Sequence, residues 1–168
     1  MIDAGGYFVR TAGERDLPAV RALLVETWHD TYDAIYGRER VDEITGAWHS
    51  IEALRARLKQ PHSEFVLADN GSDIGGVAFA VAEHEGKSIK LHQLYVLPAC
   101  QGRGIGQALF DEVAICFPEA REITLEVEEA NGRARGFYEH LGFEQMGQSE
   151  DCGSAGFDIP ALIYRRLL

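Results

Sequence analysis

The chain has 168 residues, of which 46% are hydrophobic, so it is long enough for one globular domain with a sizeable core and too short for two full domains. Its 27 acidic and 16 basic residues give a formal net charge of −11, the wrong sign for a protein that binds nucleic-acid phosphates. No apolar run reaches the roughly 18 residues of a membrane span, and no secretion signal begins the chain. We therefore expect one domain over residues 1–168, in the cytoplasm, without a nucleic-acid or membrane partner.

The cysteines and the charge distribution bear on the kind of site that the protein can carry. Cys100, Cys116 and Cys152 are odd in number and lack the spacing of metal ligands, so neither a disulfide framework nor a metal site is predicted. Between Asp111 and Asp151, eleven acidic residues stand against three arginines. Such a negative field favours a cationic substrate, while a solubilising surface explains the same charges.

The first part of the chain predicts a strand and two helices. Residues 7–12 are strand-like, and Asp16 with Pro18 then marks the start of an amphipathic helix. A second amphipathic helix is expected over residues 41–58. The stretch 30–40 is rich in aromatic side chains but has no clear period, and we interpret it as a loop or an irregular helix.

The second part predicts a sheet interleaved with helices. Three β-favouring runs separated by turn signals predict an antiparallel meander over residues 64–68, 74–82 and 87–97. The last predicted strand spans residues 157–167, where Pro160 indicates a bulge or a sheet edge. Between these lie a helix from Gly104 to about Cys116, a strand at 123–127, a helix capped by Asn131 and ended at Gly142, and extended chain at 143–147.

Residues 98–108 join the meander to the following helix through a glycine-rich turn, PACQGRGIGQA. A strand that enters such a turn and then a helix presents unpaired N–H groups and the helix dipole to one point, which binds anions and above all phosphates. The dinucleotide pattern GxGxxG would need glycine at 107, which is Gln107. The nucleoside-triphosphate loop fails as well, because Gly-Lys-Ser/Thr does not occur in the chain.

Two motifs in the right order instead resemble the GNAT superfamily of N-acetyltransferases. Residues 101–106 match that family's pyrophosphate-binding pattern, Gln/Arg-x-x-Gly-x-Gly/Ala. About 25 residues later, residues 131–143 resemble its second signature, N-x-x-A-x-x-x-Y-x-x-x-G-F. The resemblance extends over nearly the whole chain in element order and over residues 91–147 in sequence detail.

The resemblance implies a mixed α/β fold with a central, mostly antiparallel sheet of six to seven strands and helices on both faces. It implies transfer of an acetyl group from acetyl-coenzyme A to a primary amine by direct attack in a ternary complex. We expect a small-molecule acceptor, such as a polyamine given the acidic balance; a protein N-terminus or lysine is the alternative. A non-catalytic acyl-CoA sensor is the rival from another class. Homodimers are common in the family, so a homodimer is an expectation without an assigned interface.

The same resemblance assigns the cofactor contacts. The glycine turn is expected to hold the pyrophosphate, and the strand before it to pair its backbone with the pantetheine arm. A backbone N–H of Leu94 or Tyr95 is expected to face the acetyl carbonyl as an oxyanion donor. The predicted cofactor-binding residues are Leu94, Tyr95, Val96, Gln101, Gly102, Arg103, Gly104, Ile105, Gly106, Asn131, Ala134, Phe137 and Tyr138.

Tyr138 matches the position of the family's general acid, which protonates the departing thiolate. The base is less determined, because Lys90 stands where some members carry a glutamate. The candidate bases are His92 and Glu126, with Glu128 or a water held by Gln93 and Tyr95 as further alternatives.

The acceptor pocket of the family is walled by the first two helices and the loop between them. Tyr32 and Tyr36 are spaced four apart there and suit an aromatic wall for an amine's carbon skeleton. Trp28 falls on the apolar face of its helix, so a place in the core is its other interpretation. The predicted substrate-binding residues are Trp28, Tyr32, Tyr36 and Gln93.

Overall fold

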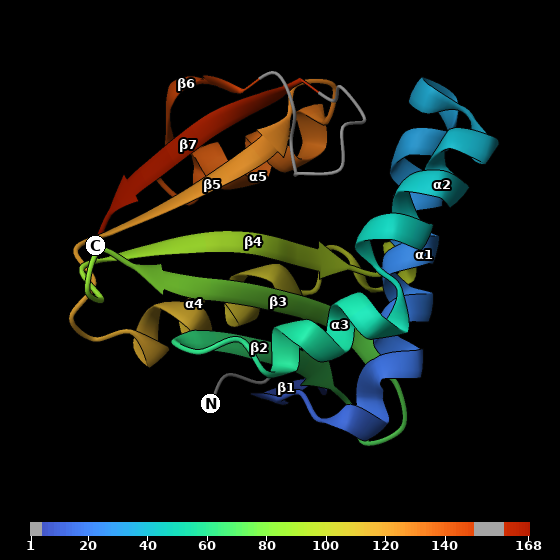
Figure 1. The fold of residues 1–168 in the computed structure, drawn as a ribbon, viewed down its shortest axis with the longest axis horizontal. Coiled ribbons are helices and arrows are strands. Elements are labelled where there is room, and N and C mark those ends of the chain that lie inside the picture. The colour runs from blue at the N-terminus through green and yellow to red at the C-terminus, as the bar shows by residue number, and fades with distance from the viewer. Residues whose placement is uncertain (1–4, 150–159) are drawn as a thin grey trace.

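The computed structural model describes residues 5–149 and 160–168 (Figure 1). In that part of the chain, one seven-stranded sheet has the order β1-β2-β3-β4-β5-β7-β6. Its neighbouring strands are antiparallel except β4 and β5, which are parallel, so the predicted fold class is confirmed. The strands are β1 (Phe8–Thr11), β2 (Ser63–Asp69), β3 (Ile74–Glu83), β4 (Ser88–Val96), β5 (Glu122–Glu128), β6 (Glu144–Ser149) and β7 (Ala161–Leu167). The helices are α1 (Leu17–Tyr36), α2 (Arg38–Trp48), α3 (Ile51–Leu58), α4 (Ile105–Cys116) and α5 (Gly132–His140).

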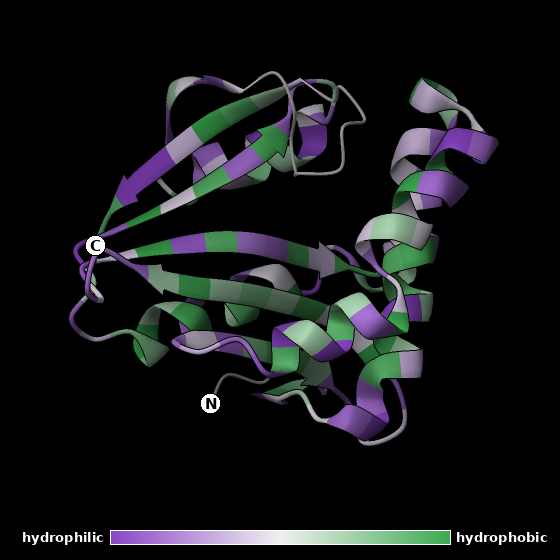
Figure 2. Ribbon diagram, in the orientation of Figure 1, coloured by the Kyte–Doolittle hydropathy of each residue, from purple (hydrophilic) through white to green (hydrophobic). Residues whose placement is uncertain are grey.

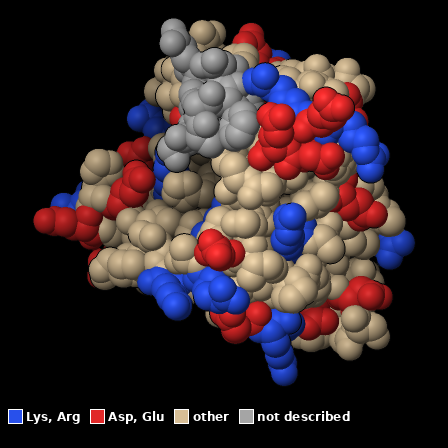
Figure 3. Space-filling model, turned by 45° about the vertical axis from the view of Figure 1, so that its right-hand side comes forward, with Lys and Arg blue, Asp and Glu red and all other residues tan. Residues whose placement is uncertain are grey.

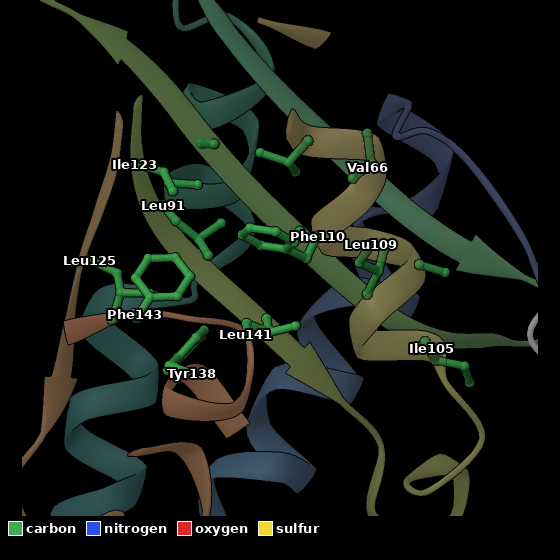
Figure 4. Packing of buried hydrophobic residues seen from close by; sticks show 14 of the residues in the cluster. Val66, Leu91, Ile105, Leu109, Phe110, Ile123, Leu125, Tyr138, Leu141 and Phe143 are labelled. Carbon is green, nitrogen blue, oxygen red and sulfur yellow. The ribbon is translucent and has the colours of Figure 1, made fainter. Parts of the chain in front are cut away.

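The sheet is covered on both faces because successive side chains of β2 and β3 enter different cores. One set packs with α1 and α3, and the other packs with α4 and α5 (Figures 1 and 4). The hydropathy of β3 follows from this, since the strand is apolar along most of its length (Figure 2). The first set contains Phe65, Leu67, Val77 and Phe79, and the second contains Val66, Ala68, Ala78 and Ala80.

The parallel strands β4 and β5 pair only over their first halves. The last paired residues are Leu91 and Leu125, and beyond them the strands diverge (Figure 1). On its other side β4 pairs Gln93 with Phe79, and Leu91 with the next residue of β3, so His92 is an extra residue at a bulge. The divergence leaves the β5-facing backbone edge of β4 without a strand partner, as an extended ligand requires.

The helical region differs from the sequence-based prediction in two places. The helix α1 continues through the aromatic stretch predicted as loop or irregular helix, and it ends at Gly37, whose φ of 85° breaks the helix. The predicted helix 41–58 is two helices, because Ser50 caps α3 by accepting a hydrogen bond from the backbone N–H of Ala53 at 3.1 Å. The hydrophobic period continues across this break and therefore does not reveal it. No helix in the described ranges is long and apolar enough to cross a membrane.

Two smaller expectations also changed. Asp16 precedes α1, but its carboxylate accepts from Gly13 N–H and from Arg10 and makes no cap bond to α1. Pro160 is exposed immediately before β7, which lies between β5 and β6 and is not an edge strand. The pairing of β6 with β7 is irregular in β6, between Gln145 and Gly147. Residues 157–159 of the predicted strand lie outside the described ranges, as does Cys152.

Candidate active site

A cleft of about 920 Å³ opens where β4 and β5 diverge. One side is formed by the glycine turn and by the first turns of α4 and α5, and the other by α1 and the segment from Ala47 to Arg57. The face drawn in Figure 3 has a recess of mainly uncharged atoms, with acidic and basic side chains intermingled around it. The predicted residues that line the cleft are His92, Gln93, Leu94, Tyr95, Val96, Gln101, Gly102, Gly104, Ile105, Gly106, Glu126, Asn131, Ala134, Phe137 and Tyr138.

The glycine turn has the geometry of an anion site. Gly102 and Gly104 have φ of 80° and 83°, a left-handed conformation that other residues rarely adopt, and a Cβ at either would meet no protein atom within 4 Å. Gly104 precedes α4 without a side-chain cap, so the first N–H groups of that helix keep no side-chain partner. The turn therefore presents bare backbone donors at the positive end of the helix dipole.

Gly106 is required by the packing of two helices. A Cβ there would lie 3.1 Å from Cζ of Phe137, so this glycine lets α5 pack against the start of α4. Arg103 is exposed and its Cβ and Cδ lie beside Gly5, outside the set of side chains that line the cleft. Arg133, which the motif analysis did not single out, lines the cleft from the first turn of α5.

Tyr138 joins the core to the cleft. Its ring packs edge-on against Phe137 and Phe143, with centroids 5.4 and 5.6 Å away. Figure 4 shows Tyr138 near Phe143 in this core. Its hydroxyl makes no hydrogen bond to the described residues, while the side chain lines the cleft. Burial, followed by the negative charge of Glu128, raises the pKa of Tyr138, so the phenol keeps its proton at neutral pH.

The candidate bases lie in three different environments. His92 lies at the bulge of β4 with its ring 5.7 Å from that of Phe79. Desolvation of its ring beside the surrounding side chains, followed by the charge of Lys90, lowers its pKa. Glu126 lies 3.8 Å from Lys90 as an ion pair. Glu128 is buried and accepts a hydrogen bond from the hydroxyl of Tyr32 at 2.5 Å.

Asn131 confirms its predicted capping role. Its Oδ1 accepts from the backbone N–H of Ala134 at 3.1 Å, and its Nδ2 donates to the hydroxyl of Tyr32 at 3.1 Å. The side chain thus ties α5 to α1 across the cleft. Its contact with the pantetheine arm stays a prediction.

The three aromatic residues predicted for the acceptor do not line the cleft. Because α1 continues through Tyr36, Trp28, Tyr32 and Tyr36 form one helical stripe, with ring centroids 4.4 and 5.5 Å apart. Trp28 and Tyr32 are each 1% exposed in a core with α2. This placement does not support acceptor contacts for them. The side chains that line this half of the cleft include Thr27, Thr31, Trp48, His49, Arg57 and Gln93.

A polar network holds this half together. Arg57 donates to the carbonyl of Trp48 at 2.5 Å and to Oε1 of Gln93 at 3.3 Å. Nε2 of Gln93 lies 3.2 Å from Nδ1 of His49, and Arg21 donates to the carbonyl of His49 at 3.3 Å. Burial and then the charge of Arg57 lower the pKa of His49 to about 3, and burial lowers the pKa of Arg57 to about 10.

Comparison with known proteins agrees with this geometry. A family model described as an acetyltransferase (GNAT) domain matches residues 32–158. The chain belongs to the GNAT acetyltransferase family. It is therefore an acetyltransferase with acetyl-coenzyme A as its cosubstrate, as the two motifs implied.

Individual relatives extend over most of the chain. A protein described as a probable N-acetyltransferase of Mycobacterium tuberculosis is 26% identical over 160 residues, which cover 94% of this chain and 91% of that protein. The N-alpha-acetyltransferase RimI of the same organism is 32% identical over 99 residues, covering 56% of this chain and 61% of RimI. The PaiA N-acetyltransferase of Thermoplasma acidophilum, solved with coenzyme A, shares the fold with a TM-score of 0.83, 21% identity, and coverage of 96% and 99%.

Proposed function

We propose that this GNAT acetyltransferase acetylates the primary amine of a small amino compound by direct attack on acetyl-coenzyme A in a ternary complex. The observation that carries the proposal is the cleft itself, which joins the uncapped glycine turn, the unpaired edge of β4 and the hydroxyl-bearing Tyr138. The anion site and the amine site lie on different sides of one strand, so both substrates reach the same backbone at once.

The cofactor lies along the α4 and α5 side of the cleft in this proposal. The N–H groups of residues 102–106 hold its pyrophosphate, and Arg133 adds a cation nearby. The pantetheine arm pairs with the β5-facing edge of β4, and the N–H of Leu94 on that edge donates to the thioester oxygen. Gln101 stabilises the end of this strand, because its Nε2 donates to the carbonyl of Val96 at 3.1 Å.

Tyr138 is the proposed general acid. When the amine nitrogen bonds to the thioester carbon and the carbon–sulfur bond breaks, the phenol donates its proton to the departing thiolate. Its raised pKa keeps the donor protonated, and its lack of a described hydrogen-bond partner leaves the O–H available for sulfur.

His92 is the proposed base that takes the proton of the attacking ammonium. Its lowered pKa makes it neutral at pH 7, and a neutral imidazole has a ring nitrogen free to accept. The bulge directs this residue into the cleft next to the strand edge that carries the thioester. The charge of Glu126 is already balanced by Lys90, which makes it the weaker candidate.

A peptide N-terminus is the second candidate acceptor. It is favoured by the 32% identity to the N-alpha-acetyltransferase RimI over residues that amount to 56% of this chain. The cleft is open enough for an extended chain end to enter, since the strands diverge up to their ends.

Release of free thiol from acetyl-coenzyme A tests the proposal. Wild-type protein and Tyr138→Phe are assayed against amino acids, polyamines, aminoglycosides and short peptides with free N-termini. We expect amine-dependent release that falls at least about tenfold in the variant, because proton donation to the thiolate is lost. Tight coenzyme A binding without turnover on any amine would favour the sensor function instead.

A further inference from the structure

Arg57 is a cation in the cleft without an anionic partner. The side chain is only partly exposed, and its guanidinium donates to one backbone carbonyl and one amide oxygen. Within residues 5–149 and 160–168, no carboxylate lies within ion-pair distance of it. A guanidinium has five N–H donors in a planar fork, so this one keeps donors for a ligand. An unbalanced, half-buried positive charge in a binding cleft favours the binding of an anion.

The hydrogen-bond network assigns a second donor in the lining of the same cleft, on His49. Arg57 only donates, so Gln93 must face it with Oε1 and turn Nε2 toward His49. Nδ1 of His49 is then the acceptor, and the single proton of the neutral ring is on Nε2. That nitrogen is buried, with His49 2% exposed, and has no hydrogen-bond partner in the described structure. A buried N–H without a partner is costly unless a ligand accepts from it.

These two donors lie on the acceptor side of β4. Side chains alternate along the strand, so Leu94 and Val96 pack with α4 and α5, where the glycine turn lies. Tyr95 packs with the cores of α1, α2 and α3, and Gln93 bonds the two residues from that region. The guanidinium and the imidazole are therefore separated by the strand from the proposed phosphate site.

We propose that Arg57 and Nε2 of His49 form a carboxylate subsite, so that the acceptor is an amine carrying a carboxylate, as an amino acid does. The inference rests on the proposed function and names its substrate class. A planar carboxylate matches the guanidinium fork in two parallel hydrogen bonds. A polyamine would instead bring further positive charge toward an unbalanced guanidinium, which opposes its binding. The acidic composition that suggested a polyamine therefore does not describe the cleft itself.

Matched acceptors test the subsite by turnover. L-leucine is compared with isoamylamine and L-tyrosine with tyramine, pairs that differ in the carboxylate, with spermidine and a short peptide added. We expect wild-type kcat/KM to be at least about tenfold higher for the carboxylate member of each pair, and Arg57→Gln to remove that preference. Arg57→Lys keeps the charge without the fork and should retain part of it. The matched control is Arg55→Gln, which removes an arginine from the same helix, α3, but from outside the cleft.

A binding measurement decides the subsite independently of turnover. Both tryptophans of the chain, Trp28 and Trp48, lie beside His49, with ring centroids 6.0 and 6.5 Å from it. Their fluorescence is titrated with N-acetyl-L-leucine and with neutral N-acetylisoamylamine in the presence of coenzyme A. We expect tighter binding of the carboxylate probe, weakened at least about tenfold in Arg57→Gln and unchanged in Arg55→Gln.

The outcomes separate the two proposals. Equal binding of the two probes, or unchanged binding in Arg57→Gln, overturns the carboxylate subsite even if amines are acetylated. Selective binding of the carboxylate probe without turnover of any amine supports the subsite and contradicts the proposed transferase reaction. Circular dichroism and thermal denaturation of all variants exclude a folding defect as the cause of a loss.

Discussion

The two halves of the cleft are built in different ways. The cofactor half comes from one continuous stretch, in which a strand leads through a glycine turn into α4 and a second motif supplies α5. The acceptor half gathers isolated polar side chains from α1, from the break between α2 and α3, and from α3. The first is mainly backbone geometry and the second is a side-chain network with one unbalanced charge. The fold therefore provides the cofactor half, and in our proposal a few side chains select the acceptor.

Loss of His92 should give the largest effect, since it is the proposed base and lines the cleft from β4, between the two halves. Replacing it with glutamine should lower kcat/KM about 100-fold at neutral pH, the scale of general base catalysis. In wild-type protein we expect activity to rise with pH through an apparent pKa below about 6.5, the ordinary histidine value, because the neutral ring is the base. This rise of activity, the acidic limb of the pH profile, should disappear in His92→Gln.

A pH–rate profile with saturating acetyl-coenzyme A measures both effects. His62→Gln is the control for loss of a histidine, because His62 lies in an exposed turn and does not line the cleft. If Glu126→Gln removed the acidic limb and His92→Gln kept it, the base would be the carboxylate on β5.

The backbone origin of the cofactor half is tested at Gly104. Valine there must adopt a φ of 83° and would project into the space that the turn leaves open. We expect coenzyme A to bind about 30-fold more weakly by calorimetry, together with a loss of stability of about 1–2 kcal/mol. Gly71→Val is the matched control, because Gly71 also has a positive φ of 94° and open space but lies in the β2–β3 turn. Equal coenzyme A affinity in the two variants would contradict the anion site.

The difference between the halves also explains how far the sequence predicts this molecule. The strands, the cap at Asn131 and the turn at residues 101–106 were predicted correctly, because each is specified by a local pattern. Arg57 and His49 carried no such signal, since neither belongs to a motif and the helix break that places them lies inside a continuous hydrophobic period. Their partnership with Gln93 joins segments 36 and 44 residues apart, which only the folded chain brings together.

The aromatic stretch illustrates the opposite error. Residues 30–40 showed no clear period and were predicted as a loop or an irregular helix, yet α1 continues through Tyr36 and buries Tyr32 against α2. The buried position 32 carries a polar atom, because the hydroxyl of Tyr32 donates to Glu128. Burial of a partnered hydroxyl cannot be recognised from sequence, since the partner is 96 residues away.

His49, in the acceptor half of the cleft, should also make the stability of the protein depend on pH. Its pKa of about 3 in the folded chain lies below the ordinary value of about 6.5, so between these pH values the unfolded chain binds a proton that the folded chain does not. The free energy of unfolding should therefore fall as pH falls through this window, by up to about 1.4 kcal/mol per pH unit from this residue. In His49→Gln that contribution disappears, so the wild-type curve should be steeper than the variant's between pH 6.5 and 4.5. Urea denaturation at a series of pH values measures the difference, and a parallel pair of curves would mean that the ring is not held neutral beside Arg57.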